Sequence, residues 1–209
     1  KIAFTGSTQV GKLIQKSLAG RDVGLTLELG GKAANIVYED AAIDQAVEGV
    51  INGIFFNQGH VCCAGSRLLL QESIHDEFVK KLEKRMQSLR VGNPLDKNTD
   101  IGAINSKEQL DKITGLVNEG VEDGGELFQT ECELPGNGFW FRPTLFTNVQ
   151  PSYSIAREEI FGPVLTTLTF RTPEEAVEIA NNTEYGLSAG VWTDCLLYTS
   201  PSPRDVSRS

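Results

Sequence analysis

Short apolar runs of strand length alternate along this chain with longer segments whose apolar residues recur at helical spacing. Strands are expected at residues 1–5, 25–29, 35–38, 67–71, 141–146 and 164–170, with a last one ending at 194. Helices are expected at 7–19, 43–56 and 107–121, and from 73 and 172 onward. Because parallel strands need such crossovers, the alternation predicts an α/β fold with a mostly parallel sheet flanked by helices.

Two of the expected helices begin with capping signals. Ser73 is followed three residues later by Asp76, a spacing that predicts a reciprocal cap. Thr172 precedes Pro173, and Glu175 stands at the third helical position. Both helices are therefore expected to start at the hydroxyl-bearing residue.

Charge and composition exclude several classes of protein. With 19 basic and 28 acidic residues the net charge is −9, which argues against a nucleic-acid partner. No run of eighteen apolar residues occurs and the first residues do not resemble a signal peptide, so no membrane association is expected. Four cysteines, two of them adjacent, do not form the framework of a secreted domain. A reducing, cytoplasmic location is predicted.

The first candidate site is the glycine turn Gly6–Lys12, between an expected strand and an expected helix. It nearly satisfies the P-loop pattern of nucleotide triphosphatases, but Leu13 replaces the hydroxyl that holds Mg²⁺. A glycine turn that feeds a helix N-terminus still suits a pyrophosphate. The segment therefore favours a dinucleotide over ATP, with a plain strand-to-helix turn as the alternative.

The second candidate is the cysteine pair in Asn57–Gly65. Thiols placed after a glycine turn and before small residues that start a helix would feel the helix dipole, which favours a nucleophilic thiolate. The alternatives are a buried, inert cysteine and a zinc site formed by His60, Cys62 and Cys63. Zinc is disfavoured because the sequence has no second cluster of ligands at zinc-like spacing.

Two carboxylate segments complete the candidates. Glu28 lies in an apolar strand-like run directly before two glycines, where burial would disfavour its charged form and make it a general base. A salt bridge to Lys32, or a strand end that faces water, is the alternative. Glu158–Pro163 places two carboxylates and an aromatic residue at a Gly-Pro turn, and alone it indicates only a turn.

Taken in order, four segments resemble the aldehyde dehydrogenase superfamily. They are FTGSTQVG, LELGGK, FFNQGHVCCAGSR and EEIFGPV. The resemblance extends from Lys1 to about Asp194 and leans toward the family 16 branch. It implies an aldehyde dehydrogenase-like fold that is incomplete in this chain.

The resemblance implies a role for each matched residue. Cys62 corresponds to the nucleophile, with Cys63 as a neighbour of undetermined role, and Glu28 to the general base. The positions that correspond to cofactor binding are Gly6, Ser7, Gly11, Leu29, Glu159 and Phe161. Gly6, Ser7 and Gly11 match the pyrophosphate site, Glu159 the carboxylate for the nicotinamide ribose, and Phe161 the aromatic beside that ring. Trp192 matches a residue that lines the substrate pocket, and no metal is implied.

The implied activity is oxidation of a small-molecule aldehyde to a carboxylic acid with NAD or NADP, through a thiohemiacetal and a thioester on Cys62. One alternative is an acylating enzyme in which coenzyme A takes the acyl group, although Glu28 disfavours it. The other is a catalytically silent binding or scaffold protein with the same fold. Cys62 and Glu28 together favour chemistry over scaffolding.

The chain departs from the family pattern in two ways. His60 stands where the family usually has Gln or Glu. Residues 1–30 match only the end of the NAD(P)-binding domain and residues 31–194 the catalytic domain, while the Ser- and Pro-rich residues 195–209 are expected to be disordered and foreign to the natural protein. The isolated chain is therefore predicted to be poorly folded and inactive, and the complete protein to be a homo-oligomer.

Overall fold

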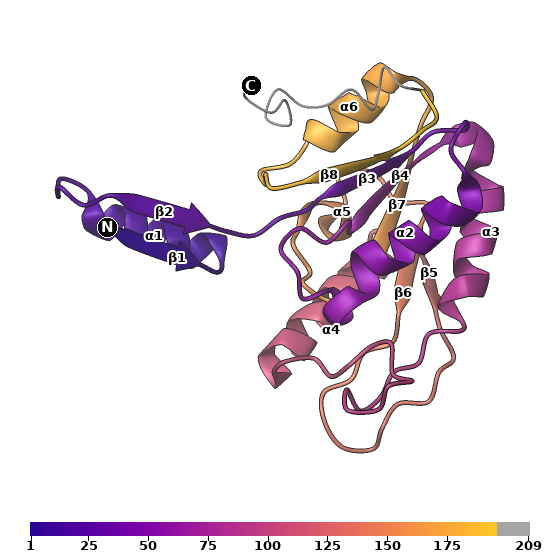
Figure 1. The fold of residues 1–209 in the computed structure, drawn as a ribbon, viewed down its shortest axis with the longest axis horizontal. Coiled ribbons are helices and arrows are strands. Elements are labelled where there is room, and N and C mark those ends of the chain that lie inside the picture. Colours follow the sequence, from indigo (N-terminus) through magenta and orange to yellow (C-terminus); the bar gives the residue numbers. More distant parts are fainter. Residues whose placement is uncertain (196–209) are drawn as a thin grey trace, which may run out of the picture.

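The computed structural model describes residues 1–195 as a small arm and a larger body (Figure 1). The arm contains β1 (Ile2–Thr5), α1 (Thr8–Leu18) and β2 (Leu25–Glu28). The body contains β3 (Ala34–Val37), α2 (Ile43–Phe55), β4 (Arg67–Gln71), α3 (His75–Met86), α4 (Lys107–Glu122), β5 (Glu126–Gln129), β6 (Thr144–Thr147), α5 (Ser154–Arg157), β7 (Val164–Phe170), α6 (Pro173–Asn181) and β8 (Ala189–Trp192). The tail expected to be disordered lies, from residue 196 on, outside the described residues.

Two sheets organise the chain. In the arm, β1 pairs with β2 in parallel. In the body, six strands follow the order β5-β6-β7-β4-β3-β8, and every pair is parallel except β5 with β6. The predicted α/β fold with a mostly parallel sheet is confirmed.

Helices cover both faces of the body sheet, and successive residues of β4 point to opposite faces. Leu68 and Leu70 are fully buried in the cluster that includes α2 and α3. Leu69, between them, is buried in the cluster that includes α6. A strand buried on both faces is the reason that this segment is apolar without interruption. No helix within residues 1–195 has the combination of length and apolar character that a membrane crossing requires.

Two elements were not predicted, and one strand begins later than expected. β5 and α5 are four-residue elements, too short for a periodic signal. β6 begins at Thr144 instead of residue 141 because Pro143 has no N–H for the ladder. The Thr144 N–H donates to the Pro163 carbonyl at 3.0 Å, while Phe141 packs against the cluster around α4.

The two capping predictions have different outcomes. Thr172 caps α6, with its hydroxyl accepting from the Glu175 N–H at 3.2 Å, as predicted. The Ser73 prediction is wrong, because residues 72–74 form a short 3-10 turn and α3 begins at His75. The Ser73 hydroxyl instead donates to the Glu39 carboxylate at 2.6 Å.

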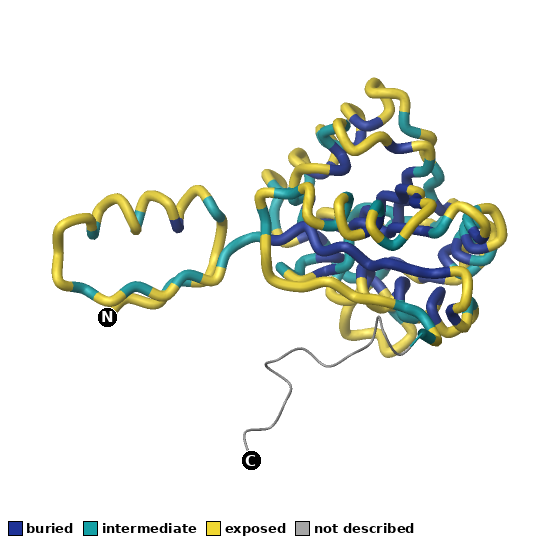
Figure 2. Tube along the Cα trace, turned by 90° about the horizontal axis from the view of Figure 1, so that it is seen from above, coloured by how far each residue is buried: buried dark blue, intermediate teal, exposed yellow. Residues whose placement is uncertain are grey.

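The arm projects from the body and is mostly exposed (Figure 2). Of its described residues, Gly11 alone is buried, where it packs against Leu29. Leu13 is 65% exposed and Val10 is 41% exposed. None of the three clusters of buried residues found within residues 1–195 includes a residue of the arm. The arm therefore has no core of its own in this chain, whereas the body does.

We expect amide hydrogens of β1, α1 and β2 in the isolated chain to exchange at least about a hundred-fold faster than those of β4 and β7. A two-stranded unit without a core is at best marginally stable. Hydrogen exchange followed by peptide mass spectrometry measures this difference. Equal protection of arm and body would contradict the prediction.

Candidate active site

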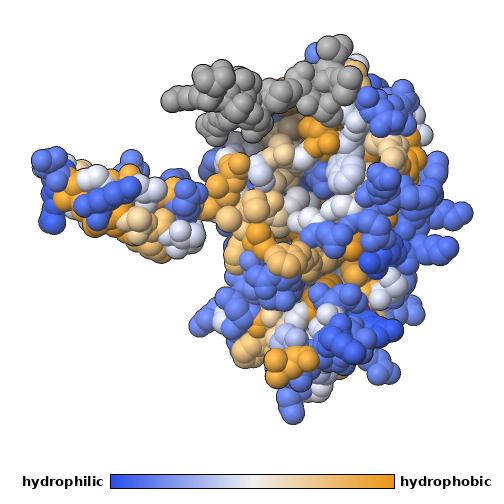
Figure 3. Space-filling view, viewed as in Figure 1, coloured by the Kyte–Doolittle hydropathy of each residue, from blue (hydrophilic) through white to orange (hydrophobic). Residues whose placement is uncertain are grey.

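A cleft of about 470 Å³ lies between the arm and the body. Figure 3 shows apolar side chains gathered on the body where it meets the arm. The cleft is lined by residues of all four matched segments and of α4: Thr5, Gly6, Ser7, Leu29, Gly30, His60, Val61, Cys62, Gln109, Lys112, Glu159 and Phe161. Six of the residues predicted from the sequence thus meet in one place.

A left-handed turn after α2 presents Cys62 to this cleft. Asn57, Gln58 and Gly59 follow one another with φ of 49°, 46° and 74°. Two consecutive non-glycine residues in this region store strain, which is typical of functional sites. Gly59 also lies so close to the Gly162 carbonyl that a Cβ atom would collide with it. The turn and the 158–163 loop are therefore packed backbone to backbone.

The structure corrects the expected environment of Cys62. The side chain is half-buried and lies in a turn, and the next regular element is β4 at Arg67. Because no helix starts within residues 62–66, the predicted helix dipole is not available to the thiol. Instead, the Cys62 carbonyl lies against Gly31, at a distance that leaves no room for a Cβ there.

The 158–163 loop is held from several directions. The Gly31 N–H donates to Glu159 Oε1 at 2.9 Å, and the same carboxylate lies against Gly30. Lys112 Nζ donates to the Glu159 carbonyl at 2.7 Å, and the Glu159 N–H donates to the Tyr185 hydroxyl at 3.4 Å. Glu159 is thereby fixed at the edge of the cleft.

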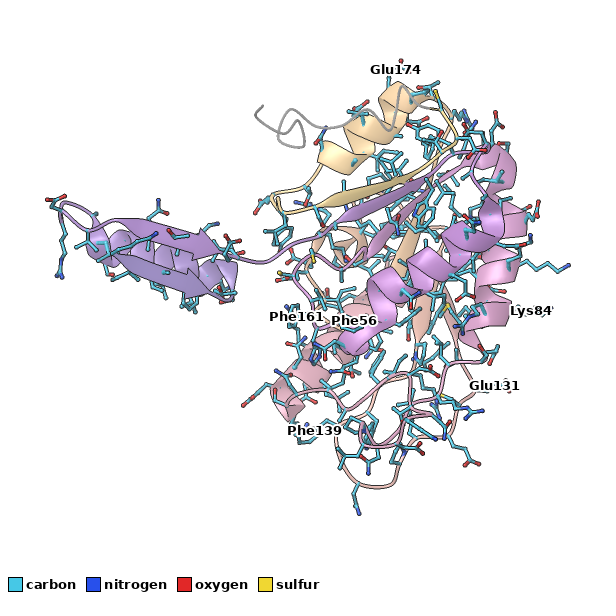
Figure 4. All side chains as sticks on the ribbon, in the orientation of Figure 1. Phe56, Lys84, Glu131, Phe139, Phe161 and Glu174 are labelled. Atoms are coloured by element: carbon cyan, nitrogen blue, oxygen red, sulfur yellow. The ribbon has the colours of Figure 1, made fainter. Side chains whose placement is uncertain are left out.

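Phe161 has a left-handed backbone with φ of 55° and is held by a neighbouring helix. Gln109 Nε2 donates to the carbonyls of Ile160 and Phe161 at 2.8 and 3.0 Å. Figure 4 shows Phe161 at the margin of the body that faces the arm. Sequence reasoning missed Gln109 and Lys112. Their spacing of three on α4 puts them on one helix face, but nothing in the sequence shows that this face meets the cleft.

The arm contributes the opposite wall. Ser7 caps α1, with its hydroxyl accepting from the Val10 N–H at 3.3 Å, and the Gly6 N–H donates to the Glu28 carbonyl at 3.0 Å. Thr5, Gly6 and Ser7 therefore carry the N-terminal end of α1 to the cleft. This is the positive end of a helix, which favours an anionic group.

Three of the predicted site residues lie outside the lining of the cleft. Glu28 is exposed at the end of β2, so the burial expected for its carboxylate is absent, although its neighbour Leu29 lines the cleft. Gly11 packs against Leu29 inside the arm. Trp192 lies beside Val37 at the far end of β3, where its indole N–H donates to Asn35 Oδ1 at 3.0 Å. Its position indicates a packing role instead of contact with a substrate.

A buried lysine lies next to the glycine pair. Lys32 is 1% exposed, and its Nζ has no hydrogen-bond partner within residues 1–195. Burial, and next the positive charge of Arg67, lower its pKa to about 7, while Glu159 and Glu158 act in the opposite direction. Arg67 is itself buried and donates to the carbonyls of Lys32, Ile179 and Ala180. The expected alternative of a Glu28–Lys32 salt bridge is absent among the described residues.

The described part of the chain contains no group of three or more His, Cys, Asp or Glu residues that could hold a metal ion. His60, Cys62 and Cys63 therefore do not form such a group. The four cysteines of residues 1–195 are all free thiols.

The sequence model of the Aldehyde dehydrogenase family matches residues 1–197. The chain belongs to this family. It is 45% identical over 195 residues to the putative aldehyde dehydrogenase DhaS of Bacillus subtilis, and 49% identical over 199 residues to retinal dehydrogenase 2 of Homo sapiens. These alignments cover 93% of the chain but 39% and 38% of the relatives, so the chain spans about two fifths of their length.

Solved structures of family members have the same fold. An NAD-dependent aldehyde dehydrogenase from Sinorhizobium meliloti superposes with a TM-score of 0.89 at 45% identity, covering 93% of this chain and 39% of that one. A betaine aldehyde dehydrogenase from Staphylococcus aureus, in complex with NAD⁺, gives a TM-score of 0.88 at 37% identity, with the same two coverages. The expected aldehyde dehydrogenase fold is thus confirmed, while the branch within the superfamily stays a prediction.

We expect Gly59→Ala to destabilise the protein by about 1–3 kcal/mol, because the left-handed backbone and the Gly162 carbonyl both oppose a Cβ. Gly115→Ala is the matched control. Gly115 is inside α4, and apart from its own turn of helix no described residue lies within 4 Å of the place its Cβ would take, so a gain of about 0.5–1 kcal/mol is expected. Denaturant unfolding measures both in a hybrid protein, in which residues 1–194 replace the matching segment of DhaS. Equal effects of the two substitutions would contradict the role of Gly59.

We expect Lys32→Met to stabilise the same hybrid, with a gain that depends on pH. The folded state holds the Lys32 pKa at about 7, below its ordinary 10.5, so folding is opposed wherever the unfolded lysine is protonated. The gain is a few kcal/mol at and below pH 7, since one pKa unit corresponds to about 1.4 kcal/mol, and it declines as pH rises toward 10.5. Denaturant unfolding between pH 6 and 10 tests it, and a pH-independent gain would rule out the lowered pKa of Lys32 as the cause.

Proposed function

We propose that the complete protein carrying this chain oxidises an aldehyde to a carboxylic acid with NAD or NADP as cofactor. One observation carries the proposal: Cys62, Glu159, Phe161, Gly6 and Ser7 line a single cleft although they are far apart in the sequence. These residues match the nucleophile and the cofactor-binding positions of the family. The NAD-dependent relative from Sinorhizobium meliloti and the NAD⁺ complex from Staphylococcus aureus support the choice of cofactor.

The residues present fit such a cofactor. The N-terminal end of α1 offers a positive pole for a pyrophosphate, and the Glu159 carboxylate at the cleft edge can accept hydrogen bonds from ribose hydroxyls. Phe161 adds an aromatic surface for a planar ring. When bound, NAD(P)⁺ supplies an acceptor for the hydride that leaves the substrate carbon.

Cys62 carries the covalent step. Its thiolate sulfur bonds to the aldehyde carbon, and the carbonyl electron pair moves to oxygen to form a thiohemiacetal. The Cys62 N–H, for which the described residues provide no hydrogen-bond acceptor, would donate to this oxyanion. After oxidation the carbon is held as a thioester on the same sulfur.

Glu28 discharges the thioester. Its carboxylate accepts a proton from water, the water oxygen attacks the carbonyl carbon, and the C–S bond breaks to release the acid and regenerate the Cys62 thiolate. Glu28 is on β2 directly before Leu29, which lines the cleft. The role requires the exposed side chain to turn toward Cys62 from this position.

The domain division, assembly and location belong to the same proposal. Residues 1–30 form the end of the NAD(P)-binding domain, and residues 31–194 most of the catalytic domain. The exposed arm without a core supports this division, because the missing part of the first domain would cover it. We further propose that the complete protein is a cytoplasmic homo-oligomer and that the isolated chain is inactive.

We expect Cys62→Ser to lower aldehyde oxidation by the hybrid by several orders of magnitude, because serine lacks the nucleophilic thiolate. Cys63→Ser is the matched control, since Cys63 is the exposed neighbour outside the cleft lining, and it should keep most of the activity. NADH formation, followed by its absorbance, gives the rate. Full activity in Cys62→Ser would contradict the proposal.

Iodoacetamide labelling separates the remaining functions. In the complete protein, an enzyme requires Cys62 to react faster than Cys132 or Cys195, whereas equal rates indicate a silent binding protein. Dependence of turnover on added coenzyme A would indicate the acylating alternative. Peptide mass spectrometry after timed quenching measures the labelling rate of each cysteine.

A further inference from the structure

His60 is the one histidine of this chain that lines the cleft. It lies two residues before Cys62 and directly after the left-handed turn at 57–59. Its ring stacks on Phe161, with centroids 5.3 Å apart and planes only 8° from parallel. The two rings come from segments about a hundred residues apart, so the stack joins the turn that contains Cys62 to the 158–163 loop.

Stacking is the contact that holds the imidazole. Nε2 of His60 is buried and has no hydrogen-bond partner within residues 1–195. Burial lowers the pKa of His60 below its ordinary value, which keeps the ring neutral at physiological pH. The titratable groups that line the same cleft are Cys62, Lys112 and Glu159.

The hydrogen bond and the backbone conformation described above act on the backbone of Phe161 and not on its ring. Gln109 fixes the backbone of Phe161 through its carbonyl, and the left-handed φ sets the direction in which the side chain leaves the loop. Neither contact fixes rotation of the ring about its side-chain bonds. The stack with His60 restrains this rotation, because turning the Phe161 ring would break the near-parallel contact of the two ring faces.

We propose that His60 is a positioning residue, whose ring holds Phe161 as the aromatic wall against which the nicotinamide end of the cofactor lies; this rests on the function proposed above. Neutral His60 leaves the wall uncharged. A protonated ring would repel the positively charged nicotinamide of NAD⁺ but not the neutral ring of NADH.

Two substitutions of similar size separate aromatic stacking from simple filling of space. His60→Leu removes the ring and is expected to weaken NAD⁺ binding about three- to ten-fold, the range expected for one aromatic pair. His60→Phe keeps a ring and should bind NAD⁺ as the parent does. In a Phe161→Leu background, His60→Leu should cause no further loss, because the two rings act as a pair.

Calorimetric titration of the hybrid with NAD⁺ and with NADH, without aldehyde, measures these affinities. As the pH falls from 7.5 and His60 becomes protonated, the parent should lose affinity for NAD⁺ relative to NADH, whereas His60→Phe should show a constant ratio. His75→Phe, which changes the other histidine, at the start of α3 and outside the cleft lining, is the control and should behave as the parent.

Equal NAD⁺ affinity in His60→Leu and His60→Phe, whether both keep the affinity of the parent or both lose it, would overturn the role of His60. The same pH dependence of the ratio in the parent and in His60→Phe would also overturn it. A hybrid that binds NAD⁺ but oxidises no aldehyde contradicts the proposed function instead and leaves the comparison of the variants intact. Unfolding midpoints without cofactor show whether a lost affinity reflects a damaged fold.

Discussion

Close backbone approach between segments distant in sequence holds the candidate site together. Gly59 lies against the carbonyl of Gly162, and Gly31 lies against the carbonyl of Cys62. These contacts hold the 57–62 turn, the Gly30–Gly31 pair and the 158–163 loop at separations that any side chain would prevent. The positions of Cys62, Glu159 and Phe161 follow from this packing, and the hydrogen bonds from Gly31, Gln109 and Lys112 then orient the loop.

Much of the body could be predicted because its signals are local. Three successive leucines at 68–70 and the mixture of apolar residues and threonines at 164–170 identified the buried strands, and Thr172-Pro173 identified the start of α6. β5 and α5 could not be predicted, since four residues contain no period. The Ser73 cap failed because the Glu39 carboxylate, 34 residues away, accepts from the same hydroxyl.

Candidate site residues could be predicted from the sequence where a reactive residue type stands in a recognisable local pattern. Examples are a cysteine after a glycine turn and carboxylates near glycines. Gln109 and Lys112 could not be recognised in this way, because polar residues on an amphipathic helix are typical of a solvent-exposed face. Only the packing of α4 against the 158–163 loop brings them to the site. Trp192 shows the converse: the family resemblance placed it in the substrate pocket, but its indole N–H donates to Asn35 in the neighbouring strand. The exposure of Glu28 also depends on tertiary packing that a strand-like run does not encode.

The cleft has one wall on a body with a packed core and the other on an arm that lacks one. Any molecule that bridges the two walls must immobilise the arm as it binds, and the entropy of that ordering is subtracted from the strength of its contacts. Affinity at this cleft is therefore set partly by residues that never touch the ligand, namely those that brace α1 and its two strands. A protein segment that packs on the arm and rigidifies it before binding would tighten binding without adding a single contact to the bound molecule.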